Sequence, residues 1–365
     1  MRLARLALVL LLAVFACDHP TPPEPVDYSP NGPFSNTIPR QLTFSTGPNL
    51  SPAWLPDGSG IVYVFERVDQ ADGDRCLGVL PAAGGTLRAE ICNTSIAGAD
   101  STDAYGAPAV STGGRLFFSR ATALTRLQNA APSYQDVAVA PFASPAAAQP
   151  VRTVPYTVNG HQHYGVTQVR WLGDTAVVYV AQNVAYLTGC FGCNIDTLQT
   201  GIELARMDLK GAPGTVTTVP GTDSASSVAL GAGDTIYYTL ANDSRVLRRT
   251  LGTGDTATVW DFAAAGIARD VQIRGVKLYA VVGGKVSYYH DPSLGPVQLD
   301  QGGVVHAVNL VFSSDAALPA AGRLYRHLAL SPDGQRIVAE GYAFAVAGVD
   351  TVVSRHAALW LLDAP

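Results

Sequence analysis

The chain has 365 residues, of which 47% are hydrophobic and 15% charged, and its formal net charge is −5. That apolar content is ample for a sizeable core, and the 36 glycines and 24 prolines predict many turns. Because the sequence contains no basic stripe, we expect no nucleic-acid partner.

Residues 1–16 have the form of an export signal. Arg2 and Arg5 precede an apolar run that ends at Ala16 and is shorter than the roughly 20 residues needed to span a bilayer. The run closes as Val14-Phe15-Ala16-Cys17, which resembles the lipobox of bacterial lipoproteins, in which the cysteine is lipidated and becomes the new N-terminus. We therefore expect a lipoprotein of the cell envelope, on its periplasmic or outer-membrane face and attached to the membrane only through lipid on Cys17. The alternative is an ordinary signal peptide cleaved after Ala16.

Residues 17–37 are predicted to be a tether. Six prolines between Asp18 and Asn36 disfavour both helix and strand pairing. A Pro-rich segment adopts extended polyproline II at about 3.1 Å per residue, so the tether can reach about 60 Å from the anchor.

The remainder of the chain, 38–365, repeats one unit. Pairs of β-rich runs joined by Gly or Asp turns recur six times, with turns near residues 58, 114, 174, 234, 276 and 334. Five of these hairpins precede two further candidate strands. In the fifth unit those strands are KVSYYHD and PVQLDQG, between residues 285 and 302.

The sixth unit has only one further strand, HAALWLLD, before the chain ends. The segment IPRQLTFS, residues 38–45, supplies the missing one, and closing the ring in this way removes an exposed sheet edge. We therefore predict an all-β fold: a six-bladed β-propeller of four-stranded antiparallel blades, closed by an N-terminal strand that completes the last blade. A seventh blade would need strands hidden in residues 182–200.

Two of the six hairpins resemble a known repeat. PAWLPDGSGIVYV (52–64) and LALSPDGQRIVAE (328–340) are similar to the WD40-like repeat of TolB-type propellers, P-x-W-S-P-D-G followed by a strand. IPRQLT resembles the outer-strand end of that repeat. TolB itself carries an α/β domain ahead of its propeller, and residues 1–37 are too few for one, so the resemblance concerns fold and compartment more than TolB's role in the Tol–Pal system.

The residues of this motif are expected to have structural roles. Asp57 and Asp333 would accept hydrogen bonds from nearby backbone N–H groups, and the following glycines would take the left-handed conformation. Trp54 would lie on the packed face between blades.

Four cysteines besides Cys17 are an even number in an exported protein and predict disulfides. Cys76 starts the third strand of blade one and Cys92 ends the fourth, so antiparallel pairing brings them together. Cys190 and Cys193 form a C-x-x-C in a loop of blade three. Because a redox-active C-x-x-C opens a helix beside a βαβ unit, we interpret this one as a structural staple.

Three histidines are candidate ligands at the channel mouth. His161 and His163 precede the inner strand of blade three, and His327 begins that of blade six, with His306 in the connection before it. Such a group can bind a metal or an anion. The competing interpretation is that these are loop histidines bonded to backbone or water, because the spacing fixes no accompanying set of carboxylates.

No catalytic signature was found: the chain has no G-x-S-x-G, H-E-x-x-H, P-loop or Rossmann fingerprint. We expect no catalytic residue and no cofactor, and we expect a monomer that binds an envelope protein, a peptide or a cell-wall component. The alternative is a propeller enzyme, either a lactonase-like hydrolase or a sugar dehydrogenase, with a metal or cofactor in its channel.

Overall fold

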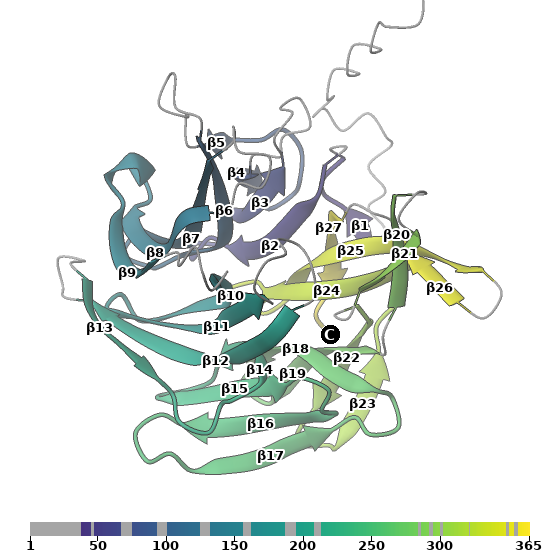
Figure 1. The fold of residues 1–365 in the computed structure, drawn as a ribbon. Helices are drawn as coiled ribbons and strands as arrows, with labels where there is room; N and C mark the ends of the chain where they lie inside the picture. The colour runs from purple at the N-terminus through teal and green to yellow at the C-terminus, as the bar shows by residue number, and fades with distance from the viewer. Residues whose placement is uncertain are drawn as a thin grey trace, which may run out of the picture.

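The computed structural model describes residues 38–44, 47–66, 75–92, 101–124, 132–155, 162–186, 195–207, 213–283, 286–291, 295–299, 302–320, 322–347, 350–353 and 357–365. They form a six-bladed β-propeller of four-stranded antiparallel blades, as predicted (Figure 1). The described part also holds one short 3-10 helix, Pro145–Ala147. It contains no helix long and apolar enough to cross a membrane.

The first three blades follow one another in chain order. Blade one comprises β2 (Asn49–Trp54), β3 (Gly60–Glu66), β4 (Arg75–Pro81) and β5 (Ala89–Ile91). Blade two comprises β6 (Ser101–Val110), β7 (Arg115–Leu124), β8 (Pro132–Pro141) and β9 (Gln149–Pro155). Blade three comprises β10 (Gln162–Leu172), β11 (Ala176–Tyr186), β12 (Ile195–Met207) and β13 (Pro213–Thr218). The described parts of residues 182–200 extend the β11–β12 hairpin of blade three and form no additional blade.

The last three blades complete the ring. Blade four comprises β14 (Ala225–Leu230), β15 (Thr235–Leu240), β16 (Arg245–Thr250) and β17 (Thr256–Asp261). Blade five comprises β18 (Ile267–Arg274), β19 (Lys277–Gly283), β22 (Val304–Asn309) and β23 (Ser314–Ala317). Blade six comprises β24 (Arg323–Leu330), β25 (Arg336–Ala347), β27 (Ala358–Asp363) and β1 (Arg40–Gln41).

Closure by the N-terminal strand is confirmed. β1 pairs antiparallel with β27, with Arg40 opposite Leu361 and Gln41 opposite Trp360. The chain continues beside β27 beyond the short strand, because the Leu42 N–H donates to the Leu359 carbonyl at 2.7 Å. The first and last described strands therefore share one blade.

The outer strands of blade five correct the prediction. KVSYYHD and PVQLDQG instead contribute β20 (Val286–Asp291) and β21 (Gly295–Leu299), an inserted hairpin whose β20 pairs with β26 (Asp350–Val353), an extension of blade six. The true outer strands are β22 and β23. An alternating apolar pattern predicts a strand but not its partner, and β23 (Ser-Asp-Ala-Ala) is exposed at every position, which leaves no such pattern.

The Pro-Asp-Gly turns have the predicted roles. Asp57 Oδ1 accepts from the Ser59 N–H at 2.9 Å, and Asp333 Oδ1 accepts from the Gln335 N–H at 3.0 Å. Gly58 and Gly334 have φ of 71° and 73°, a left-handed backbone conformation that glycine adopts more readily than residues with a side chain.

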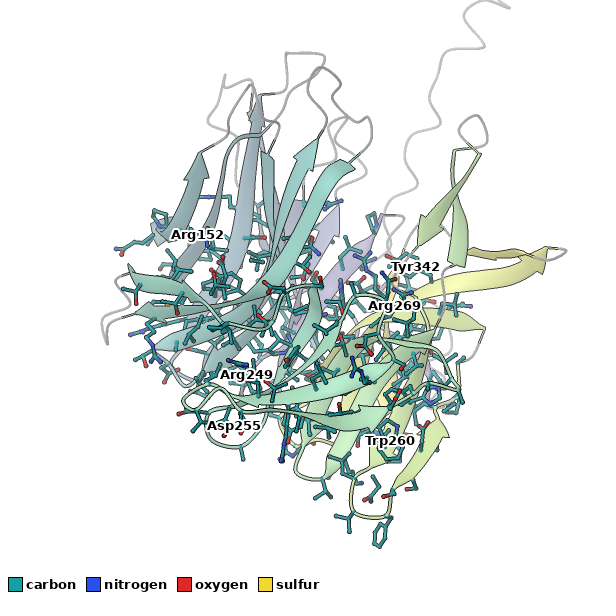
Figure 2. All side chains as sticks on the ribbon, turned by 60° about the horizontal axis from the view of Figure 1, so that its bottom comes forward. Arg152, Arg249, Asp255, Trp260, Arg269 and Tyr342 are labelled. Atoms are coloured by element: carbon teal, nitrogen blue, oxygen red, sulfur yellow. A yellow bond between two sulfur atoms is a disulfide. The ribbon has the colours of Figure 1, made fainter. Side chains whose placement is uncertain are left out.

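Neighbouring blades pack through apolar side chains that alternate along the strands (Figure 2). Arg152 and Trp260 mark the outer strands β9 and β17 in that view. Trp54 lies between blades as predicted and donates from Nε1 to the Ala329 carbonyl of blade six at 2.9 Å. Trp171 repeats this contact toward Ala109 of blade two at 3.0 Å.

Cys76 and Cys92 form the predicted disulfide. The antiparallel register places Leu77 opposite Ile91, so the flanking cysteines face each other across β4 and β5. Cys17, Cys190 and Cys193 lie outside the described residues.

Candidate functional site in the central channel

The inner strands β2, β6, β10, β14, β18 and β24 surround the axis of the ring (Figure 1). Each of them shifts register against its neighbour. Such β-bulges re-aim side chains that would otherwise alternate between the two faces. Three of the bulges hold a non-glycine residue at positive φ, namely Ser51, Ala107 and Gln168.

A hydrogen-bonded polar cluster, composed of Gln168, Arg170, Asp270 and Gln272, lies at the axis. Arg170 donates from Nη2 to Gln168 Oε1 at 2.7 Å, and Gln168 Nε2 donates to Asp270 Oδ2 at 3.1 Å. Gln272 Nε2 donates to the Leu328 carbonyl at 3.0 Å, and Arg170 reaches the same carbonyl at 3.4 Å. The cluster therefore links blades three, five and six.

Asp270 is the anionic centre of this cluster and is 1% exposed. Besides Gln168, it accepts from the backbone N–H groups of Leu328 and Val271, both at 2.6 Å. Burial raises the pKa of Asp270, and the positive charge of Arg170 opposes that rise. Burial likewise lowers the pKa of Arg170, and the negative charge of Asp270 acts in the opposite direction by favouring the charged guanidinium. Each group thus depends on the other for its charged form.

On the turn side of the cluster, the channel opens into a funnel of about 280 Å³. Its wall combines small or apolar residues with two tryptophans and two hydroxyls, and Arg170 and Gln272 also line it. The lining is Ala53, Trp54, Pro56, Ala109, Val110, Ser111, Thr112, Val169, Arg170, Trp171, Gly173, Gln272, Ala329, Leu330 and Pro332. Five of the six blades therefore contribute to one concave surface.

A second, much smaller cavity of about 10 Å³ is lined by the bulges of blades one, two, three and six. Arg170 and Val169 line both cavities. A volume of this size is at the lower limit for one water molecule, so no larger ligand fits there.

His327 is the one predicted ligand whose side chain the structure describes, and it lines the small cavity. Its Nδ1 lies 2.7 Å from Glu340 Oε2, which also accepts from the Ser51 N–H of blade one. Glu340 is fully buried, and its Oε1 has no hydrogen-bond partner among the described residues.

The remaining histidines do not extend this pair within the described residues. His161 lies outside them, and His163 is described only as a backbone position of β10, opposite Val184. His306 corrects the prediction, because it belongs to β22 and not to a connection. Its Nδ1 lies 2.9 Å from Asp315 Oδ1, and its ring packs edge-on against Phe262.

Within the described ranges, one group of side chains has metal-ligand spacing: Cys76, Glu90 and Cys92. The disulfide uses both sulfurs of this group, so it does not offer the thiolates that a zinc site needs.

The polar cluster was not predicted from the sequence. The signal available was a pair of polar residues at i and i+2 in two inner strands, TQVRW of blade three and RDVQI of blade five. Such pairs share one face of a strand, and a polar pair is unusual on a strand that is otherwise buried.

No protein-family model matches the chain, and no curated protein matches it. Solved structures of similar fold include regucalcin, a calcium-binding protein of Agrobacterium tumefaciens, at 12% identity and a TM-score of 0.51 over 89% of this chain and 92% of that one. An aldose sugar dehydrogenase of Streptomyces coelicolor has 11% identity and a TM-score of 0.48, covering 89% of this chain and 96% of that one. TolB of Acinetobacter baumannii has 12% identity and a TM-score of 0.44, with 89% and 68% covered. At such identities the likeness concerns the propeller fold alone, which both enzymes and binding proteins adopt.

Proposed function

We propose that this protein is a lipid-anchored β-propeller of the bacterial cell envelope that binds a segment of a partner, or a small ligand, in the funnel. The observation that carries the proposal is the funnel itself. Five blades form its wall, and mutually bonded polar groups close its floor. A concave, mostly apolar surface with a few convergent polar groups is typical of a recognition site.

The envelope address rests on the sequence. The signal-like residues 1–16, Cys17 in its lipobox-like setting and the Pro-rich segment to residue 37 together support an anchored domain on a long tether. The TolB-like repeats in blades one and six agree with that compartment. Mass spectrometry of the protein purified from membranes tests the anchor, because lipid on Cys17 adds diacylglycerol and acyl mass to the N-terminal peptide.

Binding is favoured over catalysis because the carboxylates near the axis already accept hydrogen bonds from protein donors. Asp270 uses both carboxylate oxygens on protein donors, and Glu340 is bonded to His327 and to the Ser51 N–H. A general acid or base must instead present its proton or lone pair to a substrate within hydrogen-bond reach.

The first experiment is cross-linking followed by mass spectrometry, with the tagged full chain in its native envelope. We expect a reproducible partner that is lost in Ala53→Leu, which narrows the funnel, and retained in Ala263→Leu, a matched change at an exposed position. Thermal melts of both variants establish that the fold is intact. A partner that still cross-links to the Ala53→Leu variant would indicate binding outside the funnel. Turnover of a small metabolite without any partner would contradict the proposal.

The enzyme alternative has one observation in its favour, the His327–Glu340 pair beside the small cavity. A carboxylate that holds one imidazole nitrogen orients the other for a metal or a proton. Elemental analysis of the purified protein tests this candidate. A stoichiometric metal that His327→Ala or His163→Ala removes would favour the enzyme, whereas no metal in the wild-type protein would eliminate its metal-dependent form.

A further inference from the structure

We propose that the funnel recognises an anionic group of its ligand, a carboxylate or a phosphate, held above Arg170. This inference deepens the proposed function and rests on it, since the same funnel is the binding site. It gives the ligand a chemical class: an anion joined to a short apolar body.

Arg170 has more hydrogen-bond donors than the described residues satisfy. Its guanidinium has five N–H donors, and the described residues accept three hydrogen bonds from it. The acceptors are the Val169 carbonyl, Gln168 Oε1 and the Leu328 carbonyl. The Nε–H is buried without an acceptor among the described residues. One of the two Nη1–H groups likewise has no acceptor within the described part of the chain.

The groups that accept hydrogen bonds from Arg170 carry no negative charge. All three acceptors are neutral oxygens, although buried guanidinium groups ordinarily pair with carboxylates. Asp270, whose charge acts on Arg170, is hydrogen-bonded to Gln168 and to two backbone N–H groups, with no direct bond to Arg170. Burial also lowers the pKa of Arg170, so its positive charge is incompletely compensated.

The wall of the funnel carries little charge. Of the described residues that line it, Arg170 is the only charged one. Asp174 stands near the rim, where it accepts from Thr112 Oγ1 and the Gly113 N–H at 3.0 and 2.7 Å. Among the described residues, an anion that enters the funnel therefore meets the Arg170 cation at the floor and no carboxylate on the wall. Asp270 belongs to the same cluster but is 1% exposed and does not line the funnel.

The size of the funnel limits its ligand. Its volume of about 280 Å³ is at the lower end of the range for ligand pockets, so it suits a small acid or the end of a longer chain. Its small and aliphatic wall residues, including Ala53, Ala109, Val110 and Leu330, complement an apolar body next to the anionic group. The C-terminal carboxylate of a peptide and a short aliphatic acid both fit this description.

Isothermal titration calorimetry of the full chain with hexanoate, hexanamide and hexyl phosphate tests the inference. Hexanoate and hexanamide share one apolar chain and differ in charge. We expect at least one of the two anions to bind about tenfold or more tightly than the amide, because charge-assisted hydrogen bonds are the stronger kind. The better of the two anions identifies the group.

Two variants separate the contributions of charge and shape. Arg170→Gln should abolish the preference for the anion over the amide, while Ala53→Leu should weaken both probes and leave Arg170 in place. Ala263→Leu serves as the control. Since Arg170→Gln can unfold the protein, the wild-type comparison of anion and amide decides by itself.

Equal binding of hexanoate and hexanamide, or no binding of either anion, would overturn the inference. An envelope partner lost in Ala53→Leu would still support the proposed function in that case. Conversely, anion binding without an envelope partner would support the inference and leave the interaction module unsupported.

Discussion

Blades one and six differ from blade five in how their hairpins are built. In blades one and six, the first two strands meet at a Pro-Asp-Gly turn whose aspartate caps backbone N–H groups. In blade five, Gly275 and Val276 connect β18 to β19, no carboxylate among the described residues caps this turn, and Val276 is exposed. Blade five also accommodates the β20–β21 hairpin between its second and third strands.

Blade five nevertheless supplies Asp270 and Gln272 to the axial cluster. Its turn also touches blade six, where Arg274 donates to the Pro332 carbonyl. The difference indicates that a blade is held by its inner strand more than by the regularity of its turns, so the repeat can degenerate where axial contacts replace it.

Asp270→Ala should have the largest effect in the four tests of this comparison. It removes the acceptor for Gln168 and two backbone N–H groups, and it deprives Arg170 of its nearby negative charge. Breaking a buried charge pair costs about 3–5 kcal/mol. Urea unfolding measures the loss, and Asp234→Ala, at an exposed turn of blade four, should be nearly neutral. Equal losses in the two variants would contradict an axial role for blade five.

Glu340→Gln tests the junction of blades six and one. It should lower the free energy of unfolding by about 2 kcal/mol at neutral pH, which is the usual contribution of a hydrogen bond to a buried charged group. Burial by itself would raise the pKa of Glu340, but the charge and hydrogen bond of His327, with help from Arg326 and the Ser51 N–H, outweigh burial and lower that pKa from its ordinary value.

A lowered carboxyl pKa stabilises the fold above the unfolded-state pKa, and this contribution disappears as the pH falls through the folded-state value. The gap in unfolding free energy between the wild-type protein and Glu340→Gln should therefore narrow on acidification. Asp255→Asn, at an exposed turn of blade four, is the control. A gap that stays constant down to low pH would show that Glu340 does not stabilise the fold through its charge.

Trp54→Phe and Trp171→Phe form the next test, since each loses one indole hydrogen bond to the preceding blade. We expect each substitution to lower the free energy of unfolding by about 1 kcal/mol, measured by thermal or urea unfolding. Trp260→Phe, on the outer strand of blade four, should cost less. If Trp171→Phe is neutral while Trp54→Phe is not, the contact matters only at the ring closure.

Val311→Ser with Phe312→Ser should have the smallest effect, within about 0.5 kcal/mol, because these side chains of the blade-five outer turn are 64% and 79% exposed. Urea unfolding measures it. A larger loss would mean that this irregular turn supports the blade after all.

Much of the fold could be predicted because strand alternation and Gly or Asp turns are local signals. They located all six inner hairpins and the closing strand, and the antiparallel register made Cys76–Cys92 foreseeable. Blade five failed where local signals mislead: the inserted β20 and β21 have clearer strand patterns than the genuine outer strand β23.

The candidate site was less predictable. Gln168, Arg170, Asp270 and Gln272 come from strands roughly a hundred residues apart along the chain, and β-bulges determine which way inner-strand side chains point. The polar pairs at i and i+2 mark each strand separately, but neither the contact between the two strands' side chains nor the bulges can be recognised from spacing. His327 was identified as the start of an inner strand, whereas it lies within β24, at the bulge between Tyr325 and Leu328. Its partner Glu340 is a single acidic residue in the apolar strand β25 of the same hairpin, and only the bond from the Ser51 N–H to Glu340 depends on the ring being closed.

The placement of β1 beside β27 also affects the order of events during synthesis. Residues 40–41 are made among the first of the propeller, yet their partner strand, 358–363, is made last. Until then the growing domain has an unpaired edge at each end, the kind of exposed strand that invites mispairing. Ring closure is therefore a late step that joins the two ends of the propeller, and a truncation that removes either β1 or β27 would leave blade six open.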